Sequence, residues 1–339
     1  YGSVFQRTPS VSRGIMKVRP SAQSTPVATT CTVSVKGKKQ EVPAWQVGEH
    51  LVVLQPGAIR IAELFDAYWL EAKTLPPFDR LVETMAAAAN PPDVVAFTQR
   101  APDTTPHYDF YHEWENVAAI PISTHDEWLR KQVSPASRRN IRTSEKRGVV
   151  VRSCPYDEVY VRGIMAICNE SPIRAGRKYW HYGKEFEVIE AENGTYRDRS
   201  TFLGAFVDGE MVGYLKLVWD AQTAAIMQIV SRVSHRDRRP NNALLSEAVR
   251  LCAERGVGHL LYERFVYGNN VDSSLTRFKR ENGFARMDLP SYYVPLTWRG
   301  RVALKLGLHH PLKDRLPLTV ASALRDARDR WNSRHVAAV

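Results

Sequence analysis

Hydrophobic and polar residues are most regularly ordered between residues 149 and 297, where two different periods predict an α/β protein. In TFLGAFVDGEMVGYLKLVW, residues 201–219, apolar and polar residues alternate on both sides of Asp208-Gly209. An Asp-Gly pair between two alternating runs predicts a hairpin with a two-residue turn. The apolar run at 223–232 predicts a further strand. Residues 243–255 carry apolar side chains on one helical face, which predicts a helix that ends at Gly256.

The same patterns continue on both sides of this core. They predict a strand at 149–152, helices at 157–170 and 186–193, a strand at 258–267, a helix at 273–281 and a last strand at 284–296. The order of elements is therefore β-α-α-β-β-β-α-β-α-β. The strand, helix and strand over 223–267 predict a right-handed crossover between parallel neighbours. We expect a mixed central sheet with helices on both faces.

The region from residue 31 to about residue 123 predicts a smaller mixed α/β subdomain. Strands are expected at 51–54, at 93–97 and within 109–122, and the turn KGKK at 36–39 predicts a hairpin. IAELFDAYWLEA, residues 61–72, has the apolar spacing of an amphipathic helix.

A basic segment joins the two regions. SPASRRNIRTSEKRGV, residues 134–149, predicts a helix with Ser134 as its N-cap, Pro135 at its first position and Gly148 at its C-terminal end. A solvated linker helix and a surface for nucleic acid both remain open. The predicted organisation is a disordered leader at 1–30, an N-terminal subdomain at 31–130, a linker helix at 131–148, a second domain at 149–297 and a basic tail at 298–339.

Composition narrows the class of protein. The chain has 339 residues, of which 44% are hydrophobic, so it can bury a sizeable core. The sequence contains no run of about 18 apolar residues, which is the length that would predict a membrane-spanning helix. The four cysteines are far apart and form no Cys/His cluster of metal-ligand spacing, which predicts reduced thiols, no metal and a cytoplasmic location. The first 30 residues carry four Lys/Arg and no acid, as a leader before a start near Met16 or a transit peptide would.

The net charge of +11 predicts an anionic partner. Nucleic acid, a membrane surface and a phosphorylated small molecule all fit it. Residues 298–335 hold nine Lys/Arg and three Asp, so the tail carries over half of the excess. This basic amphipathic tail is expected either to lie on an anionic membrane surface or to pack as a terminal helix pair. The sequence does not indicate the oligomeric state.

A cluster of charge occupies the junction between the strand at 223–232 and the next helix. The loop VSHRDRRPNNA, residues 233–243, places Arg236, Arg238 and Arg239 where backbone N–H groups and the helix dipole favour an anion. Asn241 and Asn242 are expected to cap the helix. This loop predicts a cradle for a diphosphate, and a solvent-exposed charged turn is the alternative.

These motifs resemble the Gcn5-related N-acyltransferase superfamily, in the order of elements from 149 to 297 and in the junction loop. In that superfamily the loop carries Arg or Gln, two residues, Gly, one residue, and Gly or Ala, and here Arg238, Asn241 and Ala243 stand at those positions. Asn241 departs from the pattern. LTRFKRENGF, residues 275–284, resembles the family's helix that ends in Asn-Gly-Phe, but Phe278 and Lys279 stand where the family often has a Tyr that protonates the leaving thiolate.

A second resemblance covers more of the chain. Residues 122–151 resemble the segment that joins the halves of Fem-type aminoacyl transferases, which implies that residues 31–130 are a reduced first copy of the fold. The superfamily resemblance implies direct transfer of an acyl group from a coenzyme A thioester to an amine. Acyl-coenzyme A would then be a co-substrate, with no permanently bound cofactor. A Fem-type enzyme using aminoacyl-tRNA and a non-catalytic copy that binds a ligand are the two alternatives.

Several residues are candidates for such a site. Glu263 and Tyr267 share one face of the predicted strand 258–267 and are the candidate base and acid. Gln228, a polar residue in an apolar strand, and Asn270 or Asp272, near the start of the next helix, are candidates to contact the donor. The loop 169–186 offers Arg174, Arg177, His181 and Tyr182 to an anionic or sugar-like amine acceptor. A loop pinned by buried aromatic residues is the other interpretation.

Overall fold

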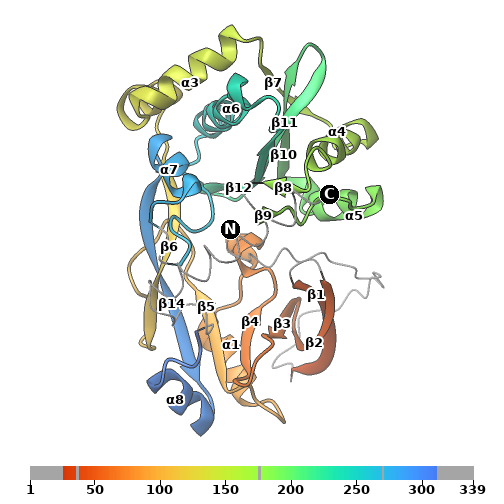
Figure 1. The fold of residues 1–339 in the computed structure, drawn as a ribbon. Coiled ribbons are helices and arrows are strands. Elements are labelled where there is room, and N and C mark those ends of the chain that lie inside the picture. Colours follow the sequence, from red (N-terminus) through yellow and green to blue (C-terminus); the bar gives the residue numbers. More distant parts are fainter. Residues whose placement is uncertain (1–25, 36–37, 175–176, 269–270, 311–339) are drawn as a thin grey trace. The chain divides into compact units, whose positions relative to one another are not determined.

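The computed structural model of the protein describes residues 26–35, 38–174, 177–268 and 271–310 (Figure 1). The chain divides into two compact units. Of the described residues, those up to 115 and those from 288 to 310 form the first unit, and those from 116 to 287 form the second. The sequence placed the corresponding boundaries near residues 130 and 297. Within the described ranges no helix has the length and hydropathy that a membrane span requires, and no cysteine forms a disulfide.

The first unit is a sheet with few helices. Its elements in chain order are β1 (Val27–Val35), β2 (Lys38–Val47), β3 (His50–Leu54), β4 (Ile61–Leu64), α1 (Phe78–Ala86), β5 (Val94–Thr98), the start of β6 (His112–Pro121), most of β14 (Ala285–Pro295) and α8 (Trp298–Lys305). The strand order is β1-β2-β3-β4-β5-β14. Only β4 and β5 are parallel, because α1 connects them as a crossover. The strands predicted at 51–54, 93–97 and 109–122 are confirmed, as is the β1–β2 hairpin, whose residues 36–37 lie outside the described ranges.

The helix predicted at 61–72 is wrong. Residues 61–64 form β4, and a left-handed residue, Asp66, precedes a single 3₁₀ turn at Ala67–Trp69. The physical reason lies in tertiary pairing, since β4 lies between β3 and β5 and buries Ala62 and Leu64 on one face. A four-residue strand with two partners overrides the helical spacing of its apolar residues.

The second unit has helices on both faces of its sheet (Figure 1). Its elements are the rest of β6, α2 (His125–Glu127), a π-helix (Trp128–Gln132), α3 (Pro135–Lys146), β7 (Val150–Cys154), α4 (Glu158–Cys168), β8 (Ile173–Arg174), β9 (Arg177–Lys178), α5 (Phe186–Asn193), β10 (Ser200–Val207), β11 (Glu210–Trp219), β12 (Thr223–Ser231), α6 (Pro240–Glu254), β13 (His259–Leu261) and α7 (Ser274–Glu281). The strand order is β7-β10-β11-β12-β13-β6, and only β12 and β13 are parallel. The predicted elements occur in the predicted order, with the short strands β8 and β9 added between α4 and α5, and the predicted parallel neighbours β12 and β13 are confirmed.

Local sequence signals explain most of these elements. Asp208 and Gly209 both have positive φ, 51° and 85°, as the predicted two-residue hairpin turn requires. In α3 the Ser134 side chain accepts a hydrogen bond from the Ser137 amide at 3.1 Å, which confirms the predicted cap. The predicted capping of α6 by Asn241 and Asn242 is wrong. Helix α6 begins at Pro240, whose fixed φ suits the first helical position, so both asparagines lie inside its first turn.

Both units use one strand plan. Each has a run of four antiparallel strands, then a crossover helix, a parallel fifth strand and an antiparallel sixth strand. In the second unit α4 and α5 lie between the first strand, β7, and the second, β10. In the first unit a direct hairpin replaces those helices. The N-terminal unit is therefore the smaller version of the plan.

Candidate active site in the second unit

Strands β12 and β13 part after a short parallel pairing. Thr223, Ala224 and Ala225 pair with His259, Leu260 and Leu261, and β13 ends there while β12 continues to Ser231. The later residues of β12 therefore have a β11 partner on one edge only. In open α/β sheets, ligands bind beyond the carboxyl ends of strands where neighbouring strands separate. The point where β12 and β13 separate is therefore the expected position of a ligand-binding site.

The strand predicted to run to residue 267 ends early because the chain changes partner. The Tyr262 amide donates to Ala118 O and the Ala118 amide donates to Glu263 O, both at 2.8 Å. The Val266 amide donates to Asn116 Oδ1 at 2.7 Å. These bonds draw residues 262–266 toward β6. They also hold Glu263 at φ 46°, a left-handed conformation that costs a non-glycine residue about 1 kcal/mol. Such strain is found preferentially at functional sites.

The predicted pair, Glu263 and Tyr267, is brought together at this turn. The Tyr267 hydroxyl donates a hydrogen bond to Glu263 Oε2. The prediction that they share a strand face is wrong, because β13 ends at Leu261 and the left-handed turn makes the contact instead. Burial raises the pKa of Glu263, and the Tyr267 hydrogen bond and the Lys279 charge oppose that rise.

Lys279 completes the cluster from α7. Its ammonium donates to Tyr262 O at 2.7 Å and to Arg264 O at 2.6 Å, and it lies 5.1 Å from the centre of the Tyr267 ring. Burial lowers the pKa of Lys279 to about 8, although the Glu263 carboxylate favours its charged form. A carboxyl with a raised pKa, a phenol and an ammonium thus meet in one cluster, in which Lys279 is buried and Glu263 and Tyr267 are half-buried. Such a cluster can accept and return protons near neutral pH.

Gln228 and a second buried lysine lie on β12 and β11. Gln228 Oε1 accepts a hydrogen bond from the Tyr214 hydroxyl at 3.2 Å, so its side chain is buried and bonded within the core. Opposite it, Lys216 donates to Asn193 O at 2.8 Å and to Thr195 O at 2.5 Å. Burial, with Arg199 and Arg197 nearby, lowers the pKa of Lys216 to about 7. These hydrogen bonds from Lys216 hold the end of α5 against β11.

The junction loop, residues 233–243, does not offer the free backbone amides that the predicted diphosphate site would use. The amides of Arg236, Arg238, Arg239 and Asn242 donate to loop carbonyls. Arg238 donates to Arg147 O at 2.9 Å, and Arg147 pairs with Asp237 at 2.6 Å. These contacts join the loop to the end of α3.

Other residues of the loop differ in their exposure. The side chains of Arg236 and Arg239 are exposed. Asn242 is buried and donates to Asn282 Oδ1 at 3.1 Å, and Ala243 follows it in the first turn of α6. Asn241 Oδ1 is buried and has no hydrogen-bond partner among the described residues. The exposed pair of arginines is therefore the part of the loop best placed for an anion.

In the predicted acceptor loop, residues 169–186, most of the candidate side chains make contacts within the protein. Arg174 donates to Ser231 O at 2.7 Å and Ile167 O at 2.5 Å, and lies 4.6 Å from the centre of the Tyr179 ring. His181 is buried, and burial with the nearby charges of Lys184 and Arg174 lowers its pKa to about 3. Tyr182 is exposed. The Arg177 side chain and Asn270 lie outside the described residues.

Some residues of this region could not be identified from the sequence. Lys216 and Lys279 are surrounded by apolar or aromatic neighbours that arrive from distant segments. A weak signal for Lys216 was present, because it interrupts the apolar run of its strand. Glu192 and Lys184, which pair at 2.6 Å beside His181, gave no signal.

Comparison with solved structures bears on the fold. FemX superposes with a TM-score of 0.55 over 83% of this chain and 90% of that chain, at 11% identity. The chain therefore has the Fem-type fold that FemX shows. L-PGS from Bacillus licheniformis superposes with a TM-score of 0.47, at 14% identity over 76% of this chain and 85% of that chain. A tandem GNAT protein of the clavulanic acid biosynthesis pathway has a TM-score of 0.40, at 13% identity over 81% and 85%. No family model and no curated protein matches the sequence.

Proposed function

We propose that this protein is an acyltransferase that joins an acyl group from acyl-coenzyme A to an amine. The observation that carries the proposal is the convergence of Glu263, Tyr267 and Lys279 where β12 and β13 part. The Fem-type fold supports it, because direct transfer to an amine needs a base and a proton donor at one place. The exposed Arg236 and Arg239 would hold the donor's diphosphate.

The chemistry follows from the groups in the cluster. Glu263 accepts a proton from the incoming ammonium, and the neutral amine attacks the thioester carbonyl to form the C–N bond. The C–S bond breaks as the tetrahedral intermediate collapses. The Tyr267 hydroxyl gives its proton to the leaving thiolate, and the second proton on nitrogen passes to water. The Lys279 ammonium favours the ionised carboxylate of Glu263, which is the form that accepts a proton.

Release of coenzyme A with a panel of amines tests this reaction. Glu263→Gln and Tyr267→Phe should each lower kcat roughly 100-fold or more, which is the usual weight of a general base or acid. Glu187→Gln, which changes an exposed carboxylate on α5, should keep wild-type kcat. Activity that survives both substitutions in correctly folded protein would remove the assignment of this cluster.

A separate variant tests the donor. Arg236→Ala combined with Arg239→Ala should raise KM for acyl-coenzyme A roughly tenfold and leave kcat nearly unchanged, because these charges would contact the diphosphate alone. Unchanged KM would refute this placement of the diphosphate. If acyl-coenzyme A neither binds nor is consumed with any amine, the acyltransferase proposal is refuted. The alternative, a non-catalytic protein with this fold that binds a ligand, is then favoured.

One observation favours a second candidate donor, aminoacyl-tRNA. Arg139, Arg142 and Lys146 are exposed along α3, and the Arg147–Asp237 contact joins the end of that helix to the junction loop. A polyanion held there would lose affinity steeply with salt. Arg139→Ser with Arg142→Ser should abolish salt-sensitive tRNA binding if this candidate is correct, and should leave the KM for acyl-coenzyme A unchanged if the first one is.

A further inference from the structure

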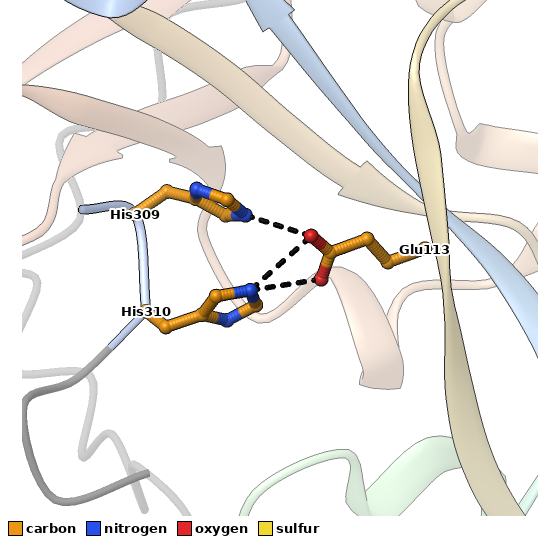
Figure 2. Close-up of side chains that lie close together, drawn as sticks. All are labelled: Glu113, His309 and His310. Atoms are coloured by element: carbon orange, nitrogen blue, oxygen red, sulfur yellow. Dashed lines mark hydrogen bonds and ion pairs between the residues drawn. The ribbon is translucent and has the colours of Figure 1, made fainter. Parts of the chain in front are cut away.

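Three ligand-type side chains converge in the first unit, in a place that the proposed acyl transfer does not use. Glu113 lies near the start of β6, while His309 and His310 follow α8 (Figure 2). His309 Nε2 lies 2.9 Å from Glu113 Oε1, and His310 Nε2 lies 3.0 Å from Glu113 Oε2. All three ligand atoms lie within 4.8 Å of one another.

The turn after α8 presents both imidazoles to the same carboxylate. Gly307 has φ 65°, and the Leu308 amide donates to Ala303 O at 2.7 Å, which closes the helix with a glycine in the left-handed conformation. This turn places His309 and His310 beside Glu113 of β6. The His309 side chain is buried, whereas His310 and Glu113 are partly exposed, so the cluster is anchored on one side and open to water on the other.

The donor set has the chemistry of a divalent metal site. Two imidazoles and one carboxylate are a ligand set found on zinc, with a fourth position left for water. Ligand atoms on a tetrahedral zinc ion lie about 3.3 Å apart at ordinary bond lengths, close to the separations of Glu113 from the two histidines. The Glu113 carboxylate is also oriented by the Tyr111 hydroxyl, which donates a hydrogen bond to Glu113 Oε1 at 2.9 Å.

We propose that Glu113, His309 and His310 bind a divalent cation, Zn²⁺ by preference, and that the ion fastens the end of α8 to β6. The sequence predicted no metal because spacing along the chain cannot bring residue 113 to residues 309 and 310. The ion stabilises the folded first unit by binding ligands that are far apart in the unfolded chain.

Binding of Zn²⁺ by the full chain after removal of metals with a chelator tests the site. Wild-type protein should bind one equivalent, and Glu113→Gln, His309→Gln and His310→Gln should each weaken binding at least about tenfold. His107→Gln is the matched control, because His107 also contacts a carboxylate, that of Asp103, in the same unit, but the described residues place no third ligand-type side chain with them.

Substitution with Co²⁺ gives an independent reading. Wild-type protein should develop the visible absorption of a tetrahedral Co²⁺ site, and Glu113→Gln should not. Circular dichroism of each variant without metal distinguishes a lost ligand from a lost fold. Absence of zinc binding by wild-type protein, or equal binding by wild type and all three ligand variants, would overturn the proposal.

A different observation supports a second proposal, on the outer face of α8. The helix turns its small residues inward, since Ala303 is buried and a Cβ at Gly300 would lie 2.0 Å from Asp93 O. Its large apolar residues face solvent instead: Trp298 is 68% exposed, Val302 43% and Leu306 65%. A row of exposed apolar side chains at this spacing marks a binding surface.

Charge identifies what that row binds. Residues 298–310 carry Arg299, Arg301 and Lys305 and no acidic residue. A hollow of about 670 Å³ beside the helix is lined by Tyr111, Pro295 and α8 residues that include Trp298 and Lys305. We infer that this face docks on an anionic phospholipid surface, with the apolar row in the headgroup boundary and the basic residues on the phosphates.

Co-sedimentation with phospholipid vesicles tests the docking face. The full chain should bind vesicles that contain about 30% phosphatidylglycerol and should not bind pure phosphatidylcholine vesicles. Trp298→Ser with Leu306→Ser, and Arg301→Gln with Lys305→Gln, should each reduce partitioning roughly tenfold. Val159→Ser, an equally exposed apolar change on α4, is the control. Both α8 variants keep the basic residues beyond 310, so undiminished binding by either would refute the assignment to α8, as would no binding by wild type.

Discussion

Acidification should destabilise the fold through the buried imidazole of His181. The residue is 8% exposed and lies against the rings of Tyr179 and Trp180. Burial, together with Lys184 and Arg174, lowers its pKa from 6.5 to about 3. Glu192 Oε2 lies 3.8 Å from His181 Nδ1, but the Lys184 ammonium already pairs with that carboxylate.

The direction and size follow from proton linkage. The unfolded chain binds the His181 proton near pH 6.5, whereas the folded state binds it only near pH 3. The stability contributed by the neutral ring is therefore fully present above pH 6.5 and is lost as the pH falls toward 3. Between pH 7 and pH 4 the free energy of unfolding should fall by about 3 kcal/mol from this group.

Urea unfolding across that pH range measures the effect. Wild-type protein should lose about 3 kcal/mol more than His181→Phe between pH 7 and pH 4, because the phenyl ring fills the site without a titrating nitrogen. Tyr182→Phe, a change at the adjacent exposed residue, should keep the wild-type dependence. If the free energy of unfolding depends on pH in the same way for wild type and for His181→Phe, burial does not keep the His181 ring neutral and the reasoning is refuted.

Three further substitutions probe the packing on which the sites depend. Gly300→Ala should lower the free energy of unfolding of the first unit by about 2 kcal/mol or more in thermal unfolding, because the new Cβ would lie 2.0 Å from Asp93 O. Trp128→Phe removes the Nε1 hydrogen bond to Asn282 O, 3.0 Å long and buried, and should cost about 1–3 kcal/mol by urea unfolding. Arg174→Met should lower Tm without changing the KM for an amine acceptor, because the guanidinium bonds to backbone carbonyls.

Where the sequence predicted the fold correctly, the deciding interactions are local. The hairpin at Asp208-Gly209 depends on two adjacent residues with positive φ, and α3 depends on Ser134 and Pro135 at its own start. The predictions were wrong where contacts with residues distant in the sequence determine the secondary structure. Residues 61–64 became a strand because β3 and β5 lie on either side, and residues 262–266 left β12 because Ala118 and Asn116 bond to them.

The candidate sites divide in the same way. Glu263 and Tyr267 were found because they are four residues apart, close enough for local reasoning even with the wrong secondary structure. The contact of Lys279 with Tyr262 O spans 17 residues, and that of His309 with Glu113 spans 196. Contacts at such separations depend on the strand plan of the whole unit, and no periodicity along the chain carries that information.

The shared strand plan also explains why the proposed chemistry belongs to the second unit. In the first unit the fifth strand, β5, is paired with β14 along its whole length, from Val94 to Thr98. The crossover helix there closes over an aromatic cluster, in which Phe78 stacks on Phe97 at 4.1 Å and Tyr292 lies 4.9 Å from Phe97.

In the second unit the fifth strand stops after three residues, and the chain turns at Glu263. Beside its fifth strand the second unit has Glu263, Tyr267 and Lys279, whereas the first unit has the aromatic cluster around Phe97. Stacked rings mainly stabilise a core, whereas a carboxyl, a phenol and an ammonium held together can exchange protons with a substrate. The second unit, which contains α4 and α5, is therefore the one whose groups suit the proposed acyl transfer, while the metal site and the docking face that we propose lie in the first unit, on β6, α8 and the turn after α8.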